Sequence, residues 1–400
     1  MRPWFRPGGR ADCIREGWKA GSSARGALYA LPGHDSLKRT GGQMRASSQP
    51  SRRDILKWGV AATSLTLMPA ARAQFATQLP KQPSPHDLTP PAPVSITVNA
   101  RPIPSFDLRD RSRTRFGALA FRSGLVLTSS FPGFGGLSSL RVDPKGRQFI
   151  SATDKGAWIT GRVVYGTAAE MTGLADVEAA PMLAHDGRPI ATHGRFDTES
   201  IALDGSFVYV GIERVNRIMR FDFAKDFTRA RGEDVEAPPA VRKLPFNRGL
   251  EALAVVPSGR PLAGTLIAIS ERGLDANKNI TAFLIGGPSP GQFAVRRTDH
   301  FDVSDACLLP TGDLLILERK FSLTGGIGIR IRRIAMTAIA PGAVVDGPSI
   351  FDADLGQEID NFEGLDAFAD DNGDVVVTLV SDDNFSLIQR TLLLQFMLVE

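Results

Sequence analysis

A repeated three-strand pattern limits the possible folds of this chain more than any other sequence feature. Each copy has a short apolar strand, a turn with Gly, Pro or Asn, a second apolar strand that ends in an acid, and a third strand. The acids that end the second strands lie 59, 58, 47 and 64 residues apart, at Asp154, Glu213, Glu271, Glu318 and Asp382. A period of this length, filled by antiparallel strands, is typical of the blades of a β-propeller. A β-helix repeats at much shorter intervals, and a β-sandwich does not repeat in this way.

Five copies are clear, and a weaker sixth copy combines residues 116–121 with residues 124–128. We therefore predict an all-β chain in which residues 105–400 form a single β-propeller of six blades. Residues 94–98 alternate between apolar and polar side chains, and we expect them to form one strand that pairs into the last blade and closes the ring.

The N-terminal region has the features of an export signal. Arg52 and Arg53 precede an apolar run over residues 58–70 and the small-residue site Ala71-Arg-Ala73. This order resembles a bacterial twin-arginine signal, with Ile55 where such signals usually have Phe. We predict a signal peptide over 44–73, after a non-native or disordered extension over 1–43. The expected location is periplasmic or secreted, with the twin-arginine translocation machinery as the partner during export.

Residues 74–104 contain eight prolines and are predicted to be an extended linker. No segment approaches the roughly 20 apolar residues that a spanning helix needs, so we expect no stable membrane insertion.

The charge distribution argues against nucleic acid as a partner. The chain has 47 Lys+Arg and 43 Asp+Glu, but residues 1–73 contain 13 of the basic and 4 of the acidic residues. The remaining 34 basic and 39 acidic residues give residues 74–400 a net charge of −5. A polyanion gains little attraction from such a surface. The two cysteines, Cys13 and Cys307, are too few for a disulfide framework or a Cys-rich zinc site.

In four copies a second acid lies at or near the start of the first strand. A hairpin brings the start of its first strand beside the end of its second strand, so both acids should lie at the same end of each blade. If the first strands are innermost, these ends surround the mouth of the central channel. The pairs are Glu199 with Glu213, Glu251 with Glu271, Asp305 with Glu318, and Glu363 with Asp382.

Three interpretations of the acids remain open. Oxygen ligands without His or Cys favour calcium over zinc or copper, which predicts a divalent cation site. Alternatively, the acids pair with the basic residues beside them (Lys155, Arg214, Arg272 and Arg319) and hold neighbouring blades together without a metal. A third possibility is a direct catalytic role. The predicted metal ligands are Glu199, Glu213, Glu251, Glu271, Glu318, Glu363 and Asp382.

Arginines beside a carboxylate-bound cation are what a phosphate ester needs for neutralisation. Arg214, Arg272 and Arg319 are therefore the predicted substrate-binding residues. They can equally serve only to balance the acids.

Six short motifs within residues 105–400 are similar to motifs of a known protein family. They are Asp197-Thr-Glu-Ser200, Asn247-Arg-Gly-Leu-Glu-Ala252, Ile269-Ser-Glu-Arg272, Leu317-Glu-Arg319, Asn361-Phe-Glu-Gly-Leu-Asp366 and Ser381-Asp-Asp-Asn-Phe385. The chain resembles the phytase-like, or "esterase-like activity of phytase", β-propeller proteins of bacteria. This resemblance implies a propeller and, by analogy with calcium-dependent propeller phytases, metal-assisted hydrolysis of phosphate esters. It supplies no agreed set of catalytic residues that can be matched here.

Two functions follow as hypotheses. The first is an exported hydrolase that acts on a small-molecule phosphate or carboxylic ester with a divalent cation, calcium, in an acid-lined channel mouth. The second is a non-catalytic periplasmic propeller that binds a ligand or protein on the same face. Fold alone does not separate them.

Overall fold

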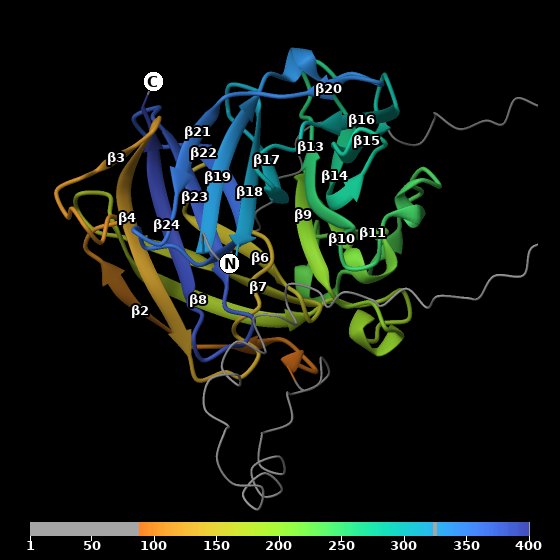
Figure 1. The fold of residues 1–400 in the computed structure, drawn as a ribbon. Coiled ribbons are helices and arrows are strands. Elements are labelled where there is room, and N and C mark those ends of the chain that lie inside the picture. Colours follow the sequence, from red (N-terminus) through yellow and green to blue (C-terminus); the bar gives the residue numbers. More distant parts are fainter. Residues whose placement is uncertain (1–87, 323–325, 400) are drawn as a thin grey trace, which may run out of the picture. The chain divides into compact units, whose positions relative to one another are not determined.

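The structure, a computed structural model, describes residues 88–322 and 326–399 (Figure 1). The predicted extension over 1–43, the signal peptide over 44–73 and the first part of the linker lie outside the described residues. Among the residues that are described, no helix has both the length and the apolar character needed to cross a bilayer.

The described chain forms five antiparallel β-sheets that are the blades of a β-propeller, apart from one short parallel pairing at the edge of blade 3. Blade 1 contains β5 (Arg141–Val142), β6 (Gln148–Thr153), β7 (Ala157–Tyr165) and β8 (Met171–Pro181). Blade 2 contains β9 (Thr198–Asp204), β10 (Phe207–Ile212), β11 (Arg217–Asp222) and β12 (Glu233–Asp234). Blade 3 contains β13 (Leu250–Val255), β14 (Thr265–Leu274), β15 (Ile280–Gly286), β16 (Gly291–Val295) and β20 (Val344–Val345).

Blades 4 and 5 complete the ring. Blade 4 contains β17 (Asp302–Leu308), β18 (Leu314–Ser322), β19 (Gly326–Ile334) and β21 (Ser349–Ala353). Blade 5 contains β22 (Asn361–Ala369), β23 (Val375–Asp382), β24 (Thr391–Leu398), β4 (Leu119–Ser129) and β2 (Val98–Ile103), and β3 (Arg115–Phe116) pairs with β4. Short 3₁₀ helices lie in the connections: η1 (Ile190–His193), η2 (Glu213–Val215), η3 (Phe227–Arg229), η4 (Val241–Lys243) and η5 (Met336–Ala338).

The prediction of six blades is wrong, because the weakest copy of the repeat is not a blade. Residues 116–121 and 124–128 were expected to be two strands, but most of them form the single strand β4, which pairs with β24 in blade 5. The two residues between the runs, Arg122 and Ser123, include none of the Gly, Asn or Asp residues that tight hairpin turns prefer, and Gly124 allows close packing instead. A Cβ at Gly124 would lie 2.6 Å from a side-chain carbon of Leu394.

The segment predicted to be one closing strand is divided between two blades. Strand β1 (Val94–Ser95) pairs with β8 in blade 1, and Val98 begins β2, which pairs with β4 in blade 5. Part of the predicted linker is therefore regular structure that joins the first and last blades. Because β24 pairs with β4, blade 5 combines strands from both ends of the described chain.

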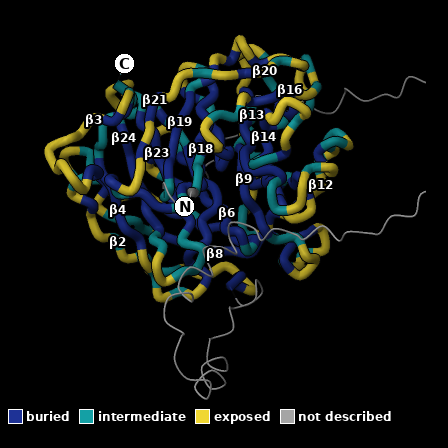
Figure 2. Tube along the Cα trace, viewed as in Figure 1, coloured by how far each residue is buried: buried dark blue, intermediate teal, exposed yellow. Residues whose placement is uncertain are grey.

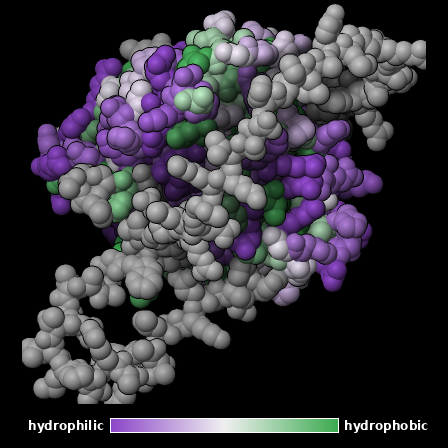
Figure 3. Space-filling view, turned by 45° about the vertical axis from the view of Figure 1, so that its right-hand side comes forward, coloured by the Kyte–Doolittle hydropathy of each residue, from purple (hydrophilic) through white to green (hydrophobic). Residues whose placement is uncertain are grey.

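The apolar core lies between the blades. Five buried clusters each join two neighbouring blades, and together they follow the ring from blade 1 to blade 5 and back. Between blades 1 and 2, for example, Trp158 packs edge-to-face against Phe221 and Phe223. Figure 2 shows the strands mainly as buried and the peripheral loops as exposed. On the face visible in Figure 3 hydrophilic residues predominate, as expected when apolar side chains are buried between sheets.

A buried arginine spans the centre of the ring. Arg141, at the start of β5, donates to both carboxylate oxygens of Asp305 at 2.8 and 3.1 Å. It also donates to the carbonyl oxygens of Leu253 at 2.8 Å, Leu365 at 2.9 Å and Ala306 at 2.9 Å. These contacts join the inner strands of blades 1, 3, 4 and 5. The Arg141–Asp305 pair thus separates the two ends of the central channel.

Candidate functional site

Four buried or half-buried carboxylates meet where the inner hairpins of blades 2 and 3 begin and end. Glu199 lies in β9, Glu213 directly follows β10, Glu251 lies in β13 and Glu271 lies in β14. Glu199, Glu213 and Glu251 are at most 3% exposed. The antiparallel pairing of β9 with β10 and of β13 with β14 places these residues at one end of the channel. We call these four residues, together with Asp197, the acidic mouth.

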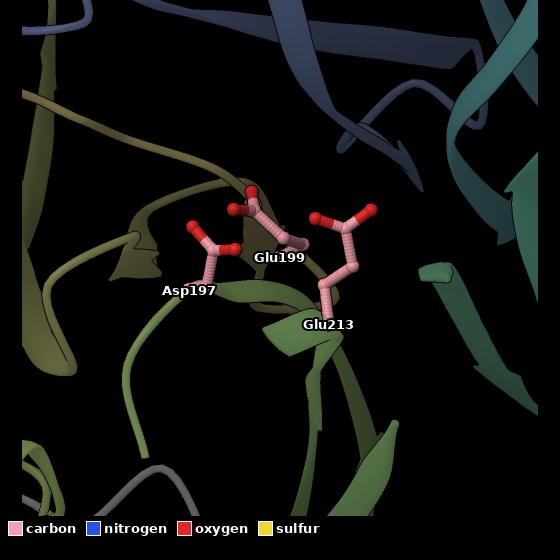
Figure 4. Close-up of side chains that lie close together, drawn as sticks. All are labelled: Asp197, Glu199 and Glu213. Carbon is pink, nitrogen blue, oxygen red and sulfur yellow. The ribbon is translucent and has the colours of Figure 1, made fainter. Parts of the chain in front are cut away.

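The oxygens of the acidic mouth form two groups that share Glu213. Asp197, Glu199 and Glu213 each offer a carboxylate oxygen, and these oxygens lie within 4.8 Å of one another (Figure 4). Glu213, Glu251 and Glu271 meet the same limit. Oxygens this close together can surround one cation, and hard oxygen donors suit calcium or magnesium.

Asp197 was not among the predicted ligands. It precedes β9 and adopts a left-handed backbone conformation with φ of 67°, which Asp tolerates better than most residues. Its backbone carbonyl accepts a hydrogen bond from the amide of Glu213 at 2.9 Å, which fixes the two residues side by side. The sequence signal that could have found it is its place in the Asp197-Thr-Glu-Ser200 motif.

Like charges shape the electrostatics of the acidic mouth. Burial raises the pKa of Glu251 well above its ordinary value, and the neighbouring carboxylates of Glu213, Glu199 and Glu271 raise it further, against the opposing charge of Arg319. Glu213 accepts a hydrogen bond from the amide of Gly249 at 2.9 Å. A cation among these oxygens would relieve the repulsion that raises the pKa of Glu251.

Arg319 connects the acidic mouth to blade 5. Its guanidinium lies 3.7 Å from Glu271, donates to Asn361 Oδ1 at 2.8 Å and forms an ion pair with Glu363. Burial alone would lower the pKa of Arg319, but the carboxylates of Glu363, Glu251 and Glu271 raise it above its ordinary value. Glu363 Oε1 also accepts from Asn361 at 2.9 Å. Glu363 Oε2 is buried and has no hydrogen-bond partner within residues 88–322 and 326–399.

A sequence model of one protein family, "Phytase-like: Esterase-like activity of phytase", matches residues 132–385. This chain belongs to the phytase-like family. The match covers more than half of the chain and includes every residue of the acidic mouth, as well as Arg319 and Glu363. No curated protein sequence matches this phytase-like chain.

Several solved structures are similar to this phytase-like chain at low identity. A putative 6-phosphogluconolactonase from Bacteroides uniformis is 15% identical, with 68% of this chain and 75% of that chain covered and a TM-score of 0.32. An endo-arabinase from Bacteroides thetaiotaomicron is 11% identical, with 67% and 95% covered and a TM-score of 0.39. The PQQ-bound aldose sugar dehydrogenase from Streptomyces coelicolor is 13% identical, with 77% and 99% covered and a TM-score of 0.34. These values support no functional conclusion.

Three predicted ligands of the phytase-like chain, Glu318, Glu363 and Asp382, lie outside both oxygen groups. Glu318 is fully buried and contacts Arg330 at 2.8 Å and Arg332 at 2.6 Å, so its charge is balanced within blade 4. Asp382 ends β23, is also buried, and accepts a hydrogen bond from the amide of Asn384 at 2.6 Å. Glu363 is linked to the acidic mouth through Arg319, which pairs with both Glu363 and Glu271.

The predicted substrate-binding arginines have three different environments. Only Arg319 forms ion pairs with predicted mouth acids. Arg272 instead pairs with the buried Asp302, which Arg297 also contacts at 2.8 Å. The guanidinium of Arg214 lies over the ring of Phe196, 4.4 Å from its centroid.

The alternative of acid–base pairing applies to part of the ring. Asp154 pairs with the adjacent Lys155 at 2.5 Å, as that alternative predicts. Glu318 is also paired, but with arginines of the third strand and not with its neighbour Arg319. Arg319 pairs with acids of the adjoining blades, Glu271 and Glu363. Each acid therefore has to be assessed in its own blade.

Proposed function

We propose that this phytase-like protein is a hydrolase of phosphate or carboxylic esters that uses a divalent cation, calcium, at the acidic mouth. The observation that carries the proposal is the convergence of carboxylate oxygens in two groups that share Glu213. Membership of the phytase-like family supports the same reaction class. The substrate in this proposal is a small-molecule ester.

The donor set fits calcium. All the converging ligand atoms are carboxylate oxygens, and neither group contains a sulfur or imidazole ligand. Calcium takes six to eight oxygen ligands in flexible geometry, whereas zinc and copper prefer nitrogen and sulfur. Glu199, Glu213, Glu251 and Glu271, with Asp197, would hold the ion. Glu318 is excluded from this proposed set, because Arg330 and Arg332 already balance its charge.

A bound calcium ion would supply positive charge against the oxygens of the ester. Arg319 adds a guanidinium beside the same carboxylates, and its planar donors suit two phosphate oxygens. Glu363 is held at Oε1 by Arg319 and Asn361, which leaves Oε2 to accept a hydrogen bond from the attacking water. Arg319 and Glu363 are therefore the residues to which we assign substrate binding and water orientation.

Hydrolysis of para-nitrophenyl phosphate and para-nitrophenyl acetate, measured with calcium and with chelator, tests this proposal. We expect calcium-dependent hydrolysis that falls at least tenfold in Glu251→Gln. Arg319→Lys should raise KM for the phosphate ester more than for the acetate, because Lys cannot donate in a bidentate manner. The matched control is Glu236→Gln, which changes an exposed acid in the connection after β12 and should leave both activities unchanged.

Hydrolysis that is insensitive to chelator and to Glu251→Gln would contradict the proposal. The second candidate function is that of a non-catalytic binding propeller. The ion pairs of Arg319 with Glu271 and Glu363 favour this candidate, because they neutralise two acids without a metal. Calcium binding without hydrolysis of either ester would support that candidate.

We also propose that the protein is exported to the periplasm or secreted through the twin-arginine machinery. The paired arginines at positions 52 and 53 support this proposal. Replacement of both by Lys should retain the protein in the cytoplasm, as measured by cell fractionation. Unchanged export of the double variant would contradict it.

A further inference from the structure

A second site lies at the end of the channel away from the acidic mouth. A cavity of about 420 Å³ is lined there by the ends of the first strands of all five blades and by the hairpin turns of blades 1, 3 and 4. We call this cavity the opposite pocket. Its size lies within the range typical of small-molecule sites.

The opposite pocket is separate from the acidic mouth. Arg141 lines it and, with its five bonds to Asp305, Leu253, Leu365 and Ala306, closes the channel between the two. A ligand in the opposite pocket therefore does not contact the carboxylates of the acidic mouth.

Most residues that line the opposite pocket are apolar, and two carboxylates, Asp143 and Asp366, lie among them. Leu203, Val255, Leu309 and Phe368 supply apolar surface. Asp366 is half-buried, and its Oδ2 accepts a hydrogen bond from the amide of Val142 at 2.7 Å. Burial raises the pKa of Asp366 to about 6, although Arg141 opposes the shift. A carboxylate in such surroundings gains strongly from a cationic partner.

The cations nearest to Asp366 are already engaged. Arg141 forms its ion pair with Asp305. Arg260, at the rim, donates to the carbonyl oxygens of Thr311 at 2.8 Å and Pro310 at 2.5 Å. Asp366 itself forms no ion pair within the described residues 88–322 and 326–399.

We propose that the opposite pocket binds a small organic cation, a primary amine that carries an apolar group. The ammonium group would lie at Asp366, and the apolar group would lie against Leu203, Val255, Leu309 and Phe368. This site is independent of the proposed ester hydrolysis.

Binding should weaken as the pH falls through about 6, because protonation of Asp366 removes the charge that attracts the amine. The other titratable groups that face this region do not reverse that trend. Arg141 stays charged, since the carboxylate of Asp305 raises its pKa despite burial. Burial raises the pKa of the Cys307 thiol, so this thiol stays neutral. Burial also raises the pKa of Asp305, and protonation of Asp305 would add net positive charge and weaken amine binding further. Asp143 and Arg260 lie at the rim.

Calorimetric titration of the full chain with benzylamine tests the proposal, with benzyl alcohol as the neutral probe of the same shape. We expect benzylamine to bind at pH 7.5 at least tenfold more tightly than benzyl alcohol. At pH 5 the affinity should fall about tenfold, the loss expected for a carboxylate with a pKa near 6. Asp366→Asn should cause a similar loss at pH 7.5.

Leu203→Trp keeps the carboxylate but fills the pocket, so it should also remove binding, and circular dichroism checks that each variant is folded. Two controls, Glu251→Gln in the acidic mouth and Asp371→Asn in the exposed β22–β23 turn, should bind benzylamine as the wild type does. Retained binding in folded Asp366→Asn and Leu203→Trp, loss of binding in Glu251→Gln, or no binding to the wild type at millimolar benzylamine would overturn the proposal.

Discussion

Blades 3 and 4 place an acid at the same point of the repeat and give it different surroundings. Glu271 and Glu318 each lie near the end of a second strand and are each followed by an arginine. Glu271 lies in a group of carboxylates with Glu213 and Glu251 and has one guanidinium, that of Arg319, at 3.7 Å. Glu318 instead contacts two arginines, Arg330 at 2.8 Å and Arg332 at 2.6 Å. The third strand makes the difference. Strand β15 has no basic residue, while β19 presents Arg330 directly opposite Glu318.

This comparison shows that position in a repeat does not determine the role of an acid. A buried carboxylate that pairs with two arginines stabilises its blade, and its removal leaves two buried cations without a balancing charge. A buried carboxylate among other carboxylates is strained without a cation and gains from binding one. The acids of blade 3 should therefore respond to calcium, and those of blade 4 should not.

The largest expected effect on stability is that of replacing Glu318, the acid that is paired with two arginines. Glu318→Gln leaves Arg330 and Arg332 buried without their balancing charge, and we expect a loss of about 3–5 kcal/mol in the free energy of unfolding. The loss should be the same with calcium and with chelator, measured by denaturant unfolding. A loss that appears only with calcium present would show that blade 4 also contributes to the cation site.

Glu251→Gln, in blade 3, should reduce the stabilisation that calcium gives to the folded protein. If calcium binds at the acidic mouth, it should stabilise the wild type by about 2.7 kcal/mol at a hundredfold excess over Kd. The variant should lose most of this gain, while its calcium-free form stays at least as stable as the wild type, because one repelling charge is removed. Thermal melts of both proteins, with calcium and with chelator, provide the measurement. The idea fails if calcium leaves the wild-type melting temperature unchanged over a wide concentration range.

Gly249→Ala should have an intermediate effect. A Cβ at this position would lie 1.9 Å from Asn216 Oδ1 and 3.3 Å from Glu213 Cγ, so the buried side chains beside the acidic mouth have to move. We expect a cost of about 1–3 kcal/mol, typical of overpacking, together with weaker calcium stabilisation. Gly205→Ala, in the β9–β10 turn, is an unsuitable control because its φ is 57°. Gly173→Ala, with nothing within 4 Å of its added Cβ, is the better one.

The smallest expected effect is the pH dependence of stability that Glu251 causes. The pKa of Glu251 is raised above its ordinary value of 4.5, so the folded protein binds this proton more tightly than the unfolded chain. The stability of the calcium-free protein should therefore fall as the pH rises from 4.5 through the raised pKa, by at most ~1.4 kcal/mol per pH unit for this one group. Glu251→Gln should show a shallower slope in melts across this range. Parallel slopes for the two proteins would mean that Glu251 titrates normally.

Part of this architecture can be predicted from the sequence. The repeat predicts a propeller, and the hairpin argument predicts that Glu199, Glu213, Glu251 and Glu271 lie at one end, where the structure places them. The number of blades was not predictable from spacing alone, because residues 116–128 resemble a hairpin in composition but most of them form one long strand.

The errors in the candidate site have a physical cause. The environment of Glu318 depends on a cross-strand neighbour, and the alternation Arg330-Ile-Arg332 in the third strand was the available signal. Asp197 was missed because its position depends on a left-handed backbone conformation outside any strand. Both features lie outside the second strands on which the repeat was aligned.

The shared fifth blade also affects how the protein can fold. Strand β4 is made early, but its partner β24 occupies residues 391–398, at the far end of the described chain. During synthesis, β4 keeps an unpaired apolar edge until residues 391–398 have left the ribosome. Closure of the ring is thus a late step between distant segments, and such long-range pairing is slow. A chain that stops before residue 391 would expose an aggregation-prone strand, so it should be recognised by chaperones and proteases as incomplete.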